Sequence, residues 1–161
     1  MANLISRLIV LMVSVPIHAI TWVIWKLCHL PFQASISPKL GGDGDSFKVL
    51  KGNKEIHVRI KGYDAPEYTQ QGGKESAQYV RNLLEEGKFK VIPVGRGHYN
   101  RLIVKIRLED GRDLRKTLIQ AGMGWDTSRA IFKMHRKARK QKTGIWAYRQ
   151  NSTPKQYRHA H

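Results

Sequence analysis

The stretch of residues 46–67, SFKVLKGNKEIHVRIKGYDAPE, contains the pattern from which the fold follows. Its two halves, residues 46–51 and 55–61, are short runs rich in Val, Ile, Phe and Leu, and Gly52-Asn53 joins them. Because Gly and Asn tolerate positive φ, this arrangement predicts a β-hairpin.

The remainder of the chain adds further strands and a few helices. Residues 88–94 and 102–108 return to strand character, whereas residues 74–86 and 114–121 place apolar side chains at helical spacing. A last helix is expected to start near Thr127 or Ser128 and to run towards Lys142. Strands without β-α-β alternation predict an α+β fold centred on a small barrel.

The N-terminal segment has a different composition. Residues 8–25 are 18 residues without a charge, and as a helix they would reach about 27 Å, close to the ~30 Å hydrocarbon core of a bilayer. Trp22 and Trp25 stand at one end, where aromatic rings favour the membrane interface, and Lys26 follows. We therefore expect residues 1–32 to be a signal anchor that holds the protein at a membrane by a single pass.

Two other interpretations of this segment stay open. A cleaved signal peptide would make the protein secreted or periplasmic, although Ile17-His18-Ala19 fits the small-residue pattern of cleavage sites poorly. A buried core helix is the other alternative. After this segment, Ser, Pro and Gly in residues 33–42 indicate a linker, and residues 149–161 form a basic C-terminal tail.

The charge balance points to a polyanionic partner. The sequence has 29 Lys and Arg against 12 Asp and Glu, a formal net charge of +17. Such a surface suits nucleic acid or an acidic lipid face, while simple solubilisation is the alternative explanation. The lone Cys28 excludes an internal disulfide and a cysteine-rich zinc site. No protein partner can be inferred.

Four short motifs with charged residues stand out between positions 43 and 101. They are Asp43-Gly44-Asp45-Ser46, Arg59 within a strand, Asp64-Ala65-Pro66-Glu67 and Tyr99-Asn100-Arg101. Taken one at a time, the acidic residues are explained by turn chemistry. Arg59 is different, because a charge in a barrel strand requires either an exposed face or a buried partner.

Together these residues have a coherent chemistry. The carboxylates of Asp45 and Asp64 are hard ligands suited to Ca²⁺ or Mg²⁺. Glu67 can accept a proton from water, and the guanidinium groups of Arg59 and Arg101 can bind a phosphoryl group and offset its growing charge. These are the parts of a metal-assisted phosphodiester hydrolysis.

These motifs, in this order and spacing, resemble the staphylococcal (thermonuclease-like) nuclease family. The resemblance extends over residues 43–148 and includes Met123-Gly124-Trp125 and Gly144-Ile145-Trp146. It implies a five-stranded OB-fold β-barrel with packed helices and Ca²⁺-dependent cleavage of DNA and RNA.

By the same resemblance, each motif residue has an expected role. Asp45, Asp64 and the carbonyl group of Ala65 would hold the metal, and Glu67 would activate or position water. Arg59 and Arg101 would bind the scissile phosphate, and Tyr99 would lie near the nucleotide.

One departure concerns the loop before Arg101. The family commonly has Asp and Gly around its tyrosine, where this sequence has Gly97 and Asn100. Asn tolerates the left-handed conformation that Gly would supply.

Two non-enzymatic hypotheses remain beside the nuclease. In the first, the chain is a non-catalytic nucleic-acid-binding OB-fold module with a basic tail that supplies affinity. In the second, it is a membrane-anchored interaction protein whose tail docks on anionic lipid. The cationic helix face formed by Arg129, Lys133, Arg136, Lys137 and Lys140 fits either a solvated surface or a phosphate-binding rim.

Overall fold

The structure is a computed structural model that describes residues 16–28, 30–38, 42–149 and 152–160. The chain divides into two compact units, Met1–Leu30 and Pro31–His161. In the first unit, helix α2 spans Ile17–Cys28. In the part of the chain that the structure describes, no helix is both long and apolar enough for a membrane crossing. The predicted segment 8–25 begins outside the described residues, so the anchor stays a prediction.

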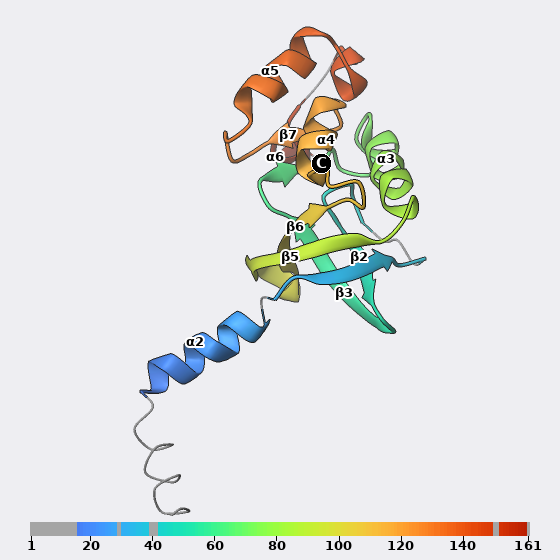
Figure 1. The fold of residues 1–161 in the computed structure, drawn as a ribbon. Coiled ribbons are helices and arrows are strands. Elements are labelled where there is room, and N and C mark those ends of the chain that lie inside the picture. Colours follow the sequence, from blue (N-terminus) through green and yellow to red (C-terminus); the bar gives the residue numbers. More distant parts are fainter. Residues whose placement is uncertain (1–15, 29, 39–41, 150–151, 161) are drawn as a thin grey trace, which may run out of the picture. The chain divides into compact units, whose positions relative to one another are not determined.

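In the second unit, five of the described strands close into a barrel in the order β1-β2-β3-β6-β5 (Figure 1). They are β1 (Phe32–Ile36), β2 (Ser46–Lys51), β3 (Lys54–Ile60), β5 (Phe89–Arg96) and β6 (Leu102–Arg107). The β3–β6 pair is parallel, and the other four pairs are antiparallel. Lys51 pairs with Lys54 around Gly52, whose φ is 58°. The predicted hairpin and α+β barrel are therefore confirmed.

Strand β1 differs from the expectation, because residues 33–42 were assigned to a linker. Phe32–Ile36 pair with β2 on one side and with β5 on the other, which closes the barrel. Pro38 and Gly42 lie after the strand, so they do not interrupt it. The strand is too short and too polar to be recognised alone, and its two neighbours provide the hydrogen bonds that form it.

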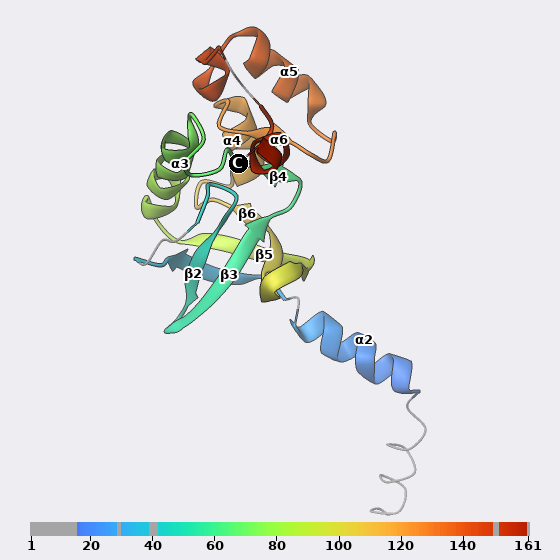
Figure 2. The same ribbon diagram turned by 180° about the vertical axis from the view of Figure 1, so that it is seen from behind.

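Helices cover one end of this barrel (Figures 1 and 2). They are α3 (Gly73–Glu85), α4 (Leu114–Gln120), α5 (Phe132–Lys140) and α6 (Pro154–Ala160). Two short 3₁₀ helices also occur: η1 (His98–Asn100) connects β5 to β6, and η2 (Gly144–Ala147) follows α5. Helix α5 starts later than predicted because the Asp126 carboxylate accepts the amide hydrogens of Ser128 and Ile131 and holds a turn there. Helix α6 lies in the region expected to be a tail.

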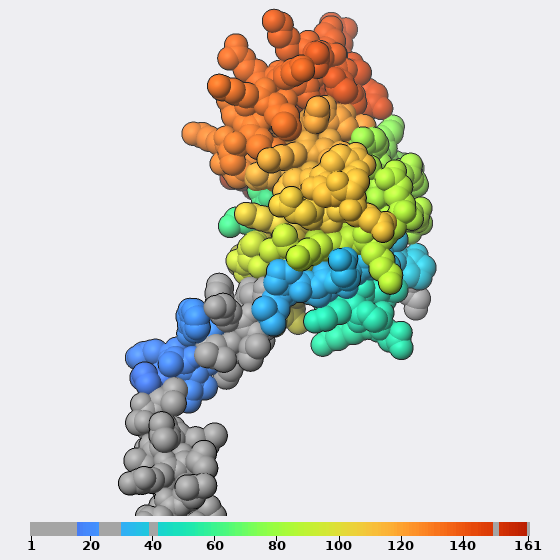
Figure 3. Space-filling view, in the orientation of Figure 1, coloured from blue at the N-terminus to red at the C-terminus, as the bar shows by residue number. Residues whose placement is uncertain are grey.

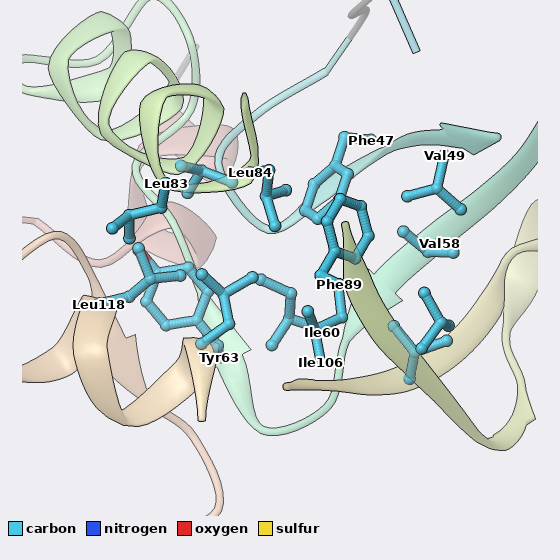
Figure 4. Packing of buried hydrophobic residues seen from close by; sticks show 14 of the residues in the cluster. Phe47, Val49, Val58, Ile60, Tyr63, Leu83, Leu84, Phe89, Ile106 and Leu118 are labelled. Atoms are coloured by element: carbon cyan, nitrogen blue, oxygen red, sulfur yellow. The ribbon is translucent and has the colours of Figure 1, made fainter. Parts of the chain in front are cut away.

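The hydrophobic core joins the inside of the barrel to the helices. Phe47, Val58, Ile60 and Phe89 point into it from the strands, and Leu84 and Leu118 add side chains from α3 and α4 (Figure 4). This core fixes the strand ends from which the charged residues of the predicted site project.

Candidate active site

Strand pairing brings the predicted site residues together from four segments. Asp45 comes directly before β2, and the first residue of β2, Ser46, pairs with Arg59 in β3. Asp64 ends β4 (Tyr63–Asp64), and Arg101 directly precedes β6, which is parallel to β3. The four charged side chains therefore meet where these strand ends lie next to one another on the barrel.

Arg59 connects the two aspartates that were predicted to bind metal. Its Nη2 atom lies 2.8 Å from Oδ2 of Asp45 and 2.8 Å from Oδ1 of Asp64, and its Nη1 donates to Oδ1 of Asp45 at 3.0 Å. The side chains of Asp45 and Asp64 are 5% and 15% exposed, against 28% for Arg59. Of the two alternatives for this strand arginine, an exposed face or a buried partner, the structure shows the second, with Asp45 and Asp64 as the partners.

The hydroxyl group of Ser46 links both arginines. Ser46 Oγ donates to Oδ1 of Asp45 at 2.7 Å. It accepts from Nη1 of Arg59 at 3.2 Å and from Nη1 of Arg101 at 3.1 Å. The two guanidinium groups therefore converge on one oxygen atom, in an arrangement that suits the binding of a single phosphoryl group.

The loop before Arg101 adopts the expected left-handed conformation. Tyr99 and Asn100 have φ of 57° and 56°, and Oδ1 of Asn100 accepts from Nη1 of Arg96 at 3.1 Å. The Gly97 amide also donates to the Arg101 carbonyl at 2.8 Å. The Tyr99 side chain is 89% exposed and lies under the Arg101 guanidinium, 5.6 Å from its ring centre. The ring therefore contacts the Arg101 guanidinium and is otherwise open to solvent.

The carboxylate pair has the chemistry of a metal site. Burial raises the pKa of Asp45 above its ordinary value, and the neighbouring Arg59 offsets part of that rise. Among the described residues, no group of three or more His, Cys, Asp or Glu side chains could hold a metal. The oxygens of Asp45 and Asp64 are hard ligands of the kind that a divalent cation prefers, and in this structure the Arg59 guanidinium bridges the two carboxylates.

Strand β4 pairs with β7 (Trp125–Asp126), and the backbone at Asp64 packs closely against the residue before β7. The buried Tyr63 hydroxyl donates to the Met123 carbonyl at 2.6 Å, and burial raises the Tyr63 pKa. A Cβ atom on Gly124 would stand 2.6 Å from the Asp64 carbonyl oxygen and 2.7 Å from the Tyr63 ring. Glycine at this position therefore allows the close approach that places Asp64.

Glu67 lies in the loop after β4 and has a different partner. Nη1 of Arg158, in helix α6, donates to its Oε1. The loop itself is tight, because a Cβ atom on Gly73 would stand 2.0 Å from the Glu67 carbonyl oxygen. Glu67 follows Asp64 by three residues in the sequence, but its side chain pairs with the C-terminal helix.

Sequence reasoning missed two contributors to this site. Ser46 was noted only as part of a motif, although its hydroxyl group joins both arginines. Arg158 was one of many basic residues in the expected tail. Its contact with Glu67 spans 91 residues, and no local sequence pattern signals a contact of that kind.

Sequence comparisons show which known proteins this chain is similar to. Residues 57–148 match the profile of the family described as staphylococcal nuclease homologue. A protein of Escherichia coli O157:H7 named uncharacterized endonuclease is 27% identical over 122 residues, which cover 73% of this chain and 80% of that protein.

Two further relatives come from a yeast and another bacterium. The probable endonuclease LCL3 of Komagataella phaffii is 31% identical over 71% of this chain and 58% of its own length. The micrococcal nuclease of Shigella flexneri is 25% identical over 97% of this chain and 91% of its own length. Because the family profile matches more than half of the sequence, the chain belongs to the staphylococcal nuclease family.

Proposed function

We propose that the chain is a metal-dependent endonuclease that hydrolyses phosphodiester bonds in DNA, RNA or both, with Ca²⁺ as the metal. The convergence of Arg59 and Arg101 on Ser46, directly beside the buried Asp45 and the partly buried Asp64, carries this proposal. The names of the relatives, which include endonucleases and a micrococcal nuclease, support it.

In this mechanism, Asp45, Asp64 and the Ala65 carbonyl group would hold the cation. The bound cation supplies charge neutralisation at the phosphoryl oxygens. Arg59 and Arg101 bind the phosphate and stabilise the negative charge that grows on it during attack.

Glu67 accepts a proton from the attacking water. Its side chain is 22% exposed, so solvent reaches it. A carboxylate beside a polyanion repels the substrate, which would be a disadvantage in a module that only binds. The presence of Glu67 therefore favours the enzyme over the non-catalytic nucleic-acid binder.

Helix α5 provides a surface on which the rest of the nucleic acid can lie. His135 and Ala138 are buried, whereas Lys133, Arg136 and Lys140 are exposed on the other side of the helix. Figure 3 shows side chains of α5, drawn in orange, projecting from the surface of the second unit. Phosphate contacts there would make substrate affinity fall steeply as salt rises.

The test is cleavage of closed circular plasmid DNA and of RNA by the purified protein, with Ca²⁺, with Mg²⁺ and with EDTA. We expect nicked circles in Ca²⁺, which identify internal cleavage, and no product in EDTA. Glu67→Gln should lower the single-turnover rate by about 10²–10⁴, while substrate affinity holds or improves.

Further variants separate catalysis from binding. Arg101→Ala should lose more turnover than ground-state binding, whereas Arg59→Ala should lose both. The exposed Glu86, whose side chain is 65% accessible, gives the matched control Glu86→Gln, which should cleave normally. Unchanged cleavage in both Glu67→Gln and Arg101→Ala would refute the assignment.

We also propose that residues 8–25 hold the enzyme at a membrane, because this stretch contains no charge and no convincing cleavage site follows it. Full-length protein should stay in the membrane pellet after a carbonate wash. A soluble product that begins after Ala19 or Ser37 would show cleavage instead.

A further inference from the structure

The C-terminal helix α6 lies on the loop that carries Glu67. Figures 1 and 2 both show α6 beside β4, the strand that leads into this loop. Arg158 pairs with Glu67, and one helical position earlier the Tyr157 hydroxyl donates to Oγ1 of Thr69 at 3.3 Å. Successive residues of α6 therefore contact the same short loop.

Gln70 ties this loop to the segment before α6. Its side chain is only 6% exposed, and both ends of its amide group are used. Oε1 accepts from the Glu67 amide at 3.2 Å, and Nε2 donates to the Ser152 carbonyl at 2.6 Å. Because a buried amide that loses a partner is costly, this bridge fixes the distance between the Glu67 backbone and the start of α6.

The start of α6 is well defined for so short a helix. The Thr153 hydroxyl accepts from the Gln156 amide at 3.3 Å, and Oε1 of Gln156 accepts from the Thr153 amide at 2.9 Å. This reciprocal arrangement is a capping box, and the buried Pro154 occupies the first helical position, where its ring fits without loss of a bond. The orientation of Arg158 is thereby set by a fixed helix.

We propose that Arg158 is a positioning residue for Glu67, so that α6 contributes to the active site by orienting this carboxylate. This inference rests on the proposed function. The ion pair holds one carboxylate oxygen, Oε1, and restricts the rotamers of Glu67, so that Oε2 is the oxygen that accepts the proton. An unheld glutamate in a loop would spend much of its time in orientations that cannot accept the proton.

Arg158 has a different hydrogen-bond partner from the two arginines that are assigned to the substrate. Arg59 and Arg101 share the Ser46 hydroxyl, whereas the Arg158 guanidinium reaches Glu67 from the opposite end of the chain. Its charge is paired with the Glu67 carboxylate, and Asp64 and Asp45 attract it as well. Arg158 therefore acts through Glu67, and the substrate charge is left to the other two arginines.

The test compares four full-length proteins in single-turnover and steady-state cleavage. Arg158→Ala should lower kcat about tenfold with little change in KM, because the loss is one of orientation. Arg158→Lys should recover part of that loss, because it restores a cation on the same helix. The exposed Lys155 of α6 gives the control Lys155→Ala, which should keep the wild-type kcat.

A double-mutant cycle shows whether Arg158 acts through Glu67. In the Glu67→Gln background, Arg158→Ala should cause no further loss of the single-turnover rate. A readout without activity is backbone hydrogen exchange in metal-free buffer. The Glu67 and Gln70 amides should exchange faster in Arg158→Ala than in Lys155→Ala.

Each contrary outcome is distinct. Unchanged kcat and exchange in Arg158→Ala would overturn the proposal. A higher kcat in Arg158→Ala would overturn it and would show that α6 inhibits the enzyme by covering the site. If Arg158→Ala still lowers the single-turnover rate in the Glu67→Gln background, Arg158 acts on the substrate, which would also overturn the proposal. A wild-type protein without nuclease activity would refute the proposed function, and the exchange data would still decide whether Arg158 holds Glu67.

Discussion

Replacing Arg59 by Met tests whether the site is held together by one guanidinium. Met keeps much of the volume of the arginine stem but removes the charge and all its donors. In the variant, Asp45 and Asp64 lose the cation that lies 2.8 Å from an oxygen of each. Two nearly buried carboxylates are then left to repel each other.

We expect Arg59→Met to lower the free energy of unfolding by a large amount for a partly exposed residue. Removing one partner from a buried ion pair costs about 3–5 kcal/mol, because the remaining charge has no compensation. Arg59 is 28% exposed, so solvent screens part of the interaction. We therefore expect the free energy of unfolding to fall by about 3 kcal/mol in EDTA. Excess Ca²⁺ should restore about 2.7 kcal/mol when its concentration is 100 times its Kd.

The assay is urea unfolding followed by the fluorescence of Trp125 and Trp146, both of which are buried. The control is Lys48→Met, on the same hairpin, where Lys48 Nζ lies 3.2 Å from Oε2 of Glu55 in a pair that is 30% and 39% exposed. That exposed pair should contribute no more than about 1 kcal/mol. Equal losses in the two variants, or a loss from Arg59→Met that Ca²⁺ leaves unchanged, would refute the reasoning.

Three further predictions concern the metal, the β4–β7 contact and pH. Asp45→Ala should sharply weaken Ca²⁺ binding in calorimetry, and identical binding would remove Asp45 from the site. Gly124→Ala should destabilise the protein by about 1–3 kcal/mol and weaken Ca²⁺ binding, since the new Cβ would displace the Asp64 backbone; urea unfolding and calorimetry would show both effects. Burial and the nearby Arg139 lower the pKa of His135 below its ordinary 6.5, so the unfolded chain binds more protons and stability should fall as pH drops below about 6.5. His135→Leu should remove that part of the slope in unfolding measurements between pH 7.5 and 5, and an unchanged slope would contradict the assignment.

The sequence by itself determined the fold class and the inventory of the site. Alternating apolar runs around Gly52-Asn53 predicted the hairpin, because residue type and spacing are local properties of a strand pair. The charged motifs around Asp45, Arg59 and Asp64 were recognisable because their order along the chain is fixed, and the structure brings them together.

Other features were decided only by tertiary structure. Strand β1 was expected to be linker, because Phe32–Ile36 carry a weak pattern and become a strand only between β2 and β5. Helix α5 begins at Phe132 rather than near Thr127, because the Asp126 carboxylate holds the preceding turn. In both cases a neighbouring segment supplies the hydrogen bonds, and the local sequence does not specify that neighbour.

The contact between Arg158 and Glu67 is the strongest example. From the sequence, Glu67 was expected to accept a proton, and Arg158 was expected to belong to a basic tail. Their pairing depends on the buried Gln70 bridge and on the fixed start of α6. Residue type determines which chemistry is available along a chain, but long-range packing decides which of those groups meet, because a contact across 91 residues is made by the fold and not by spacing.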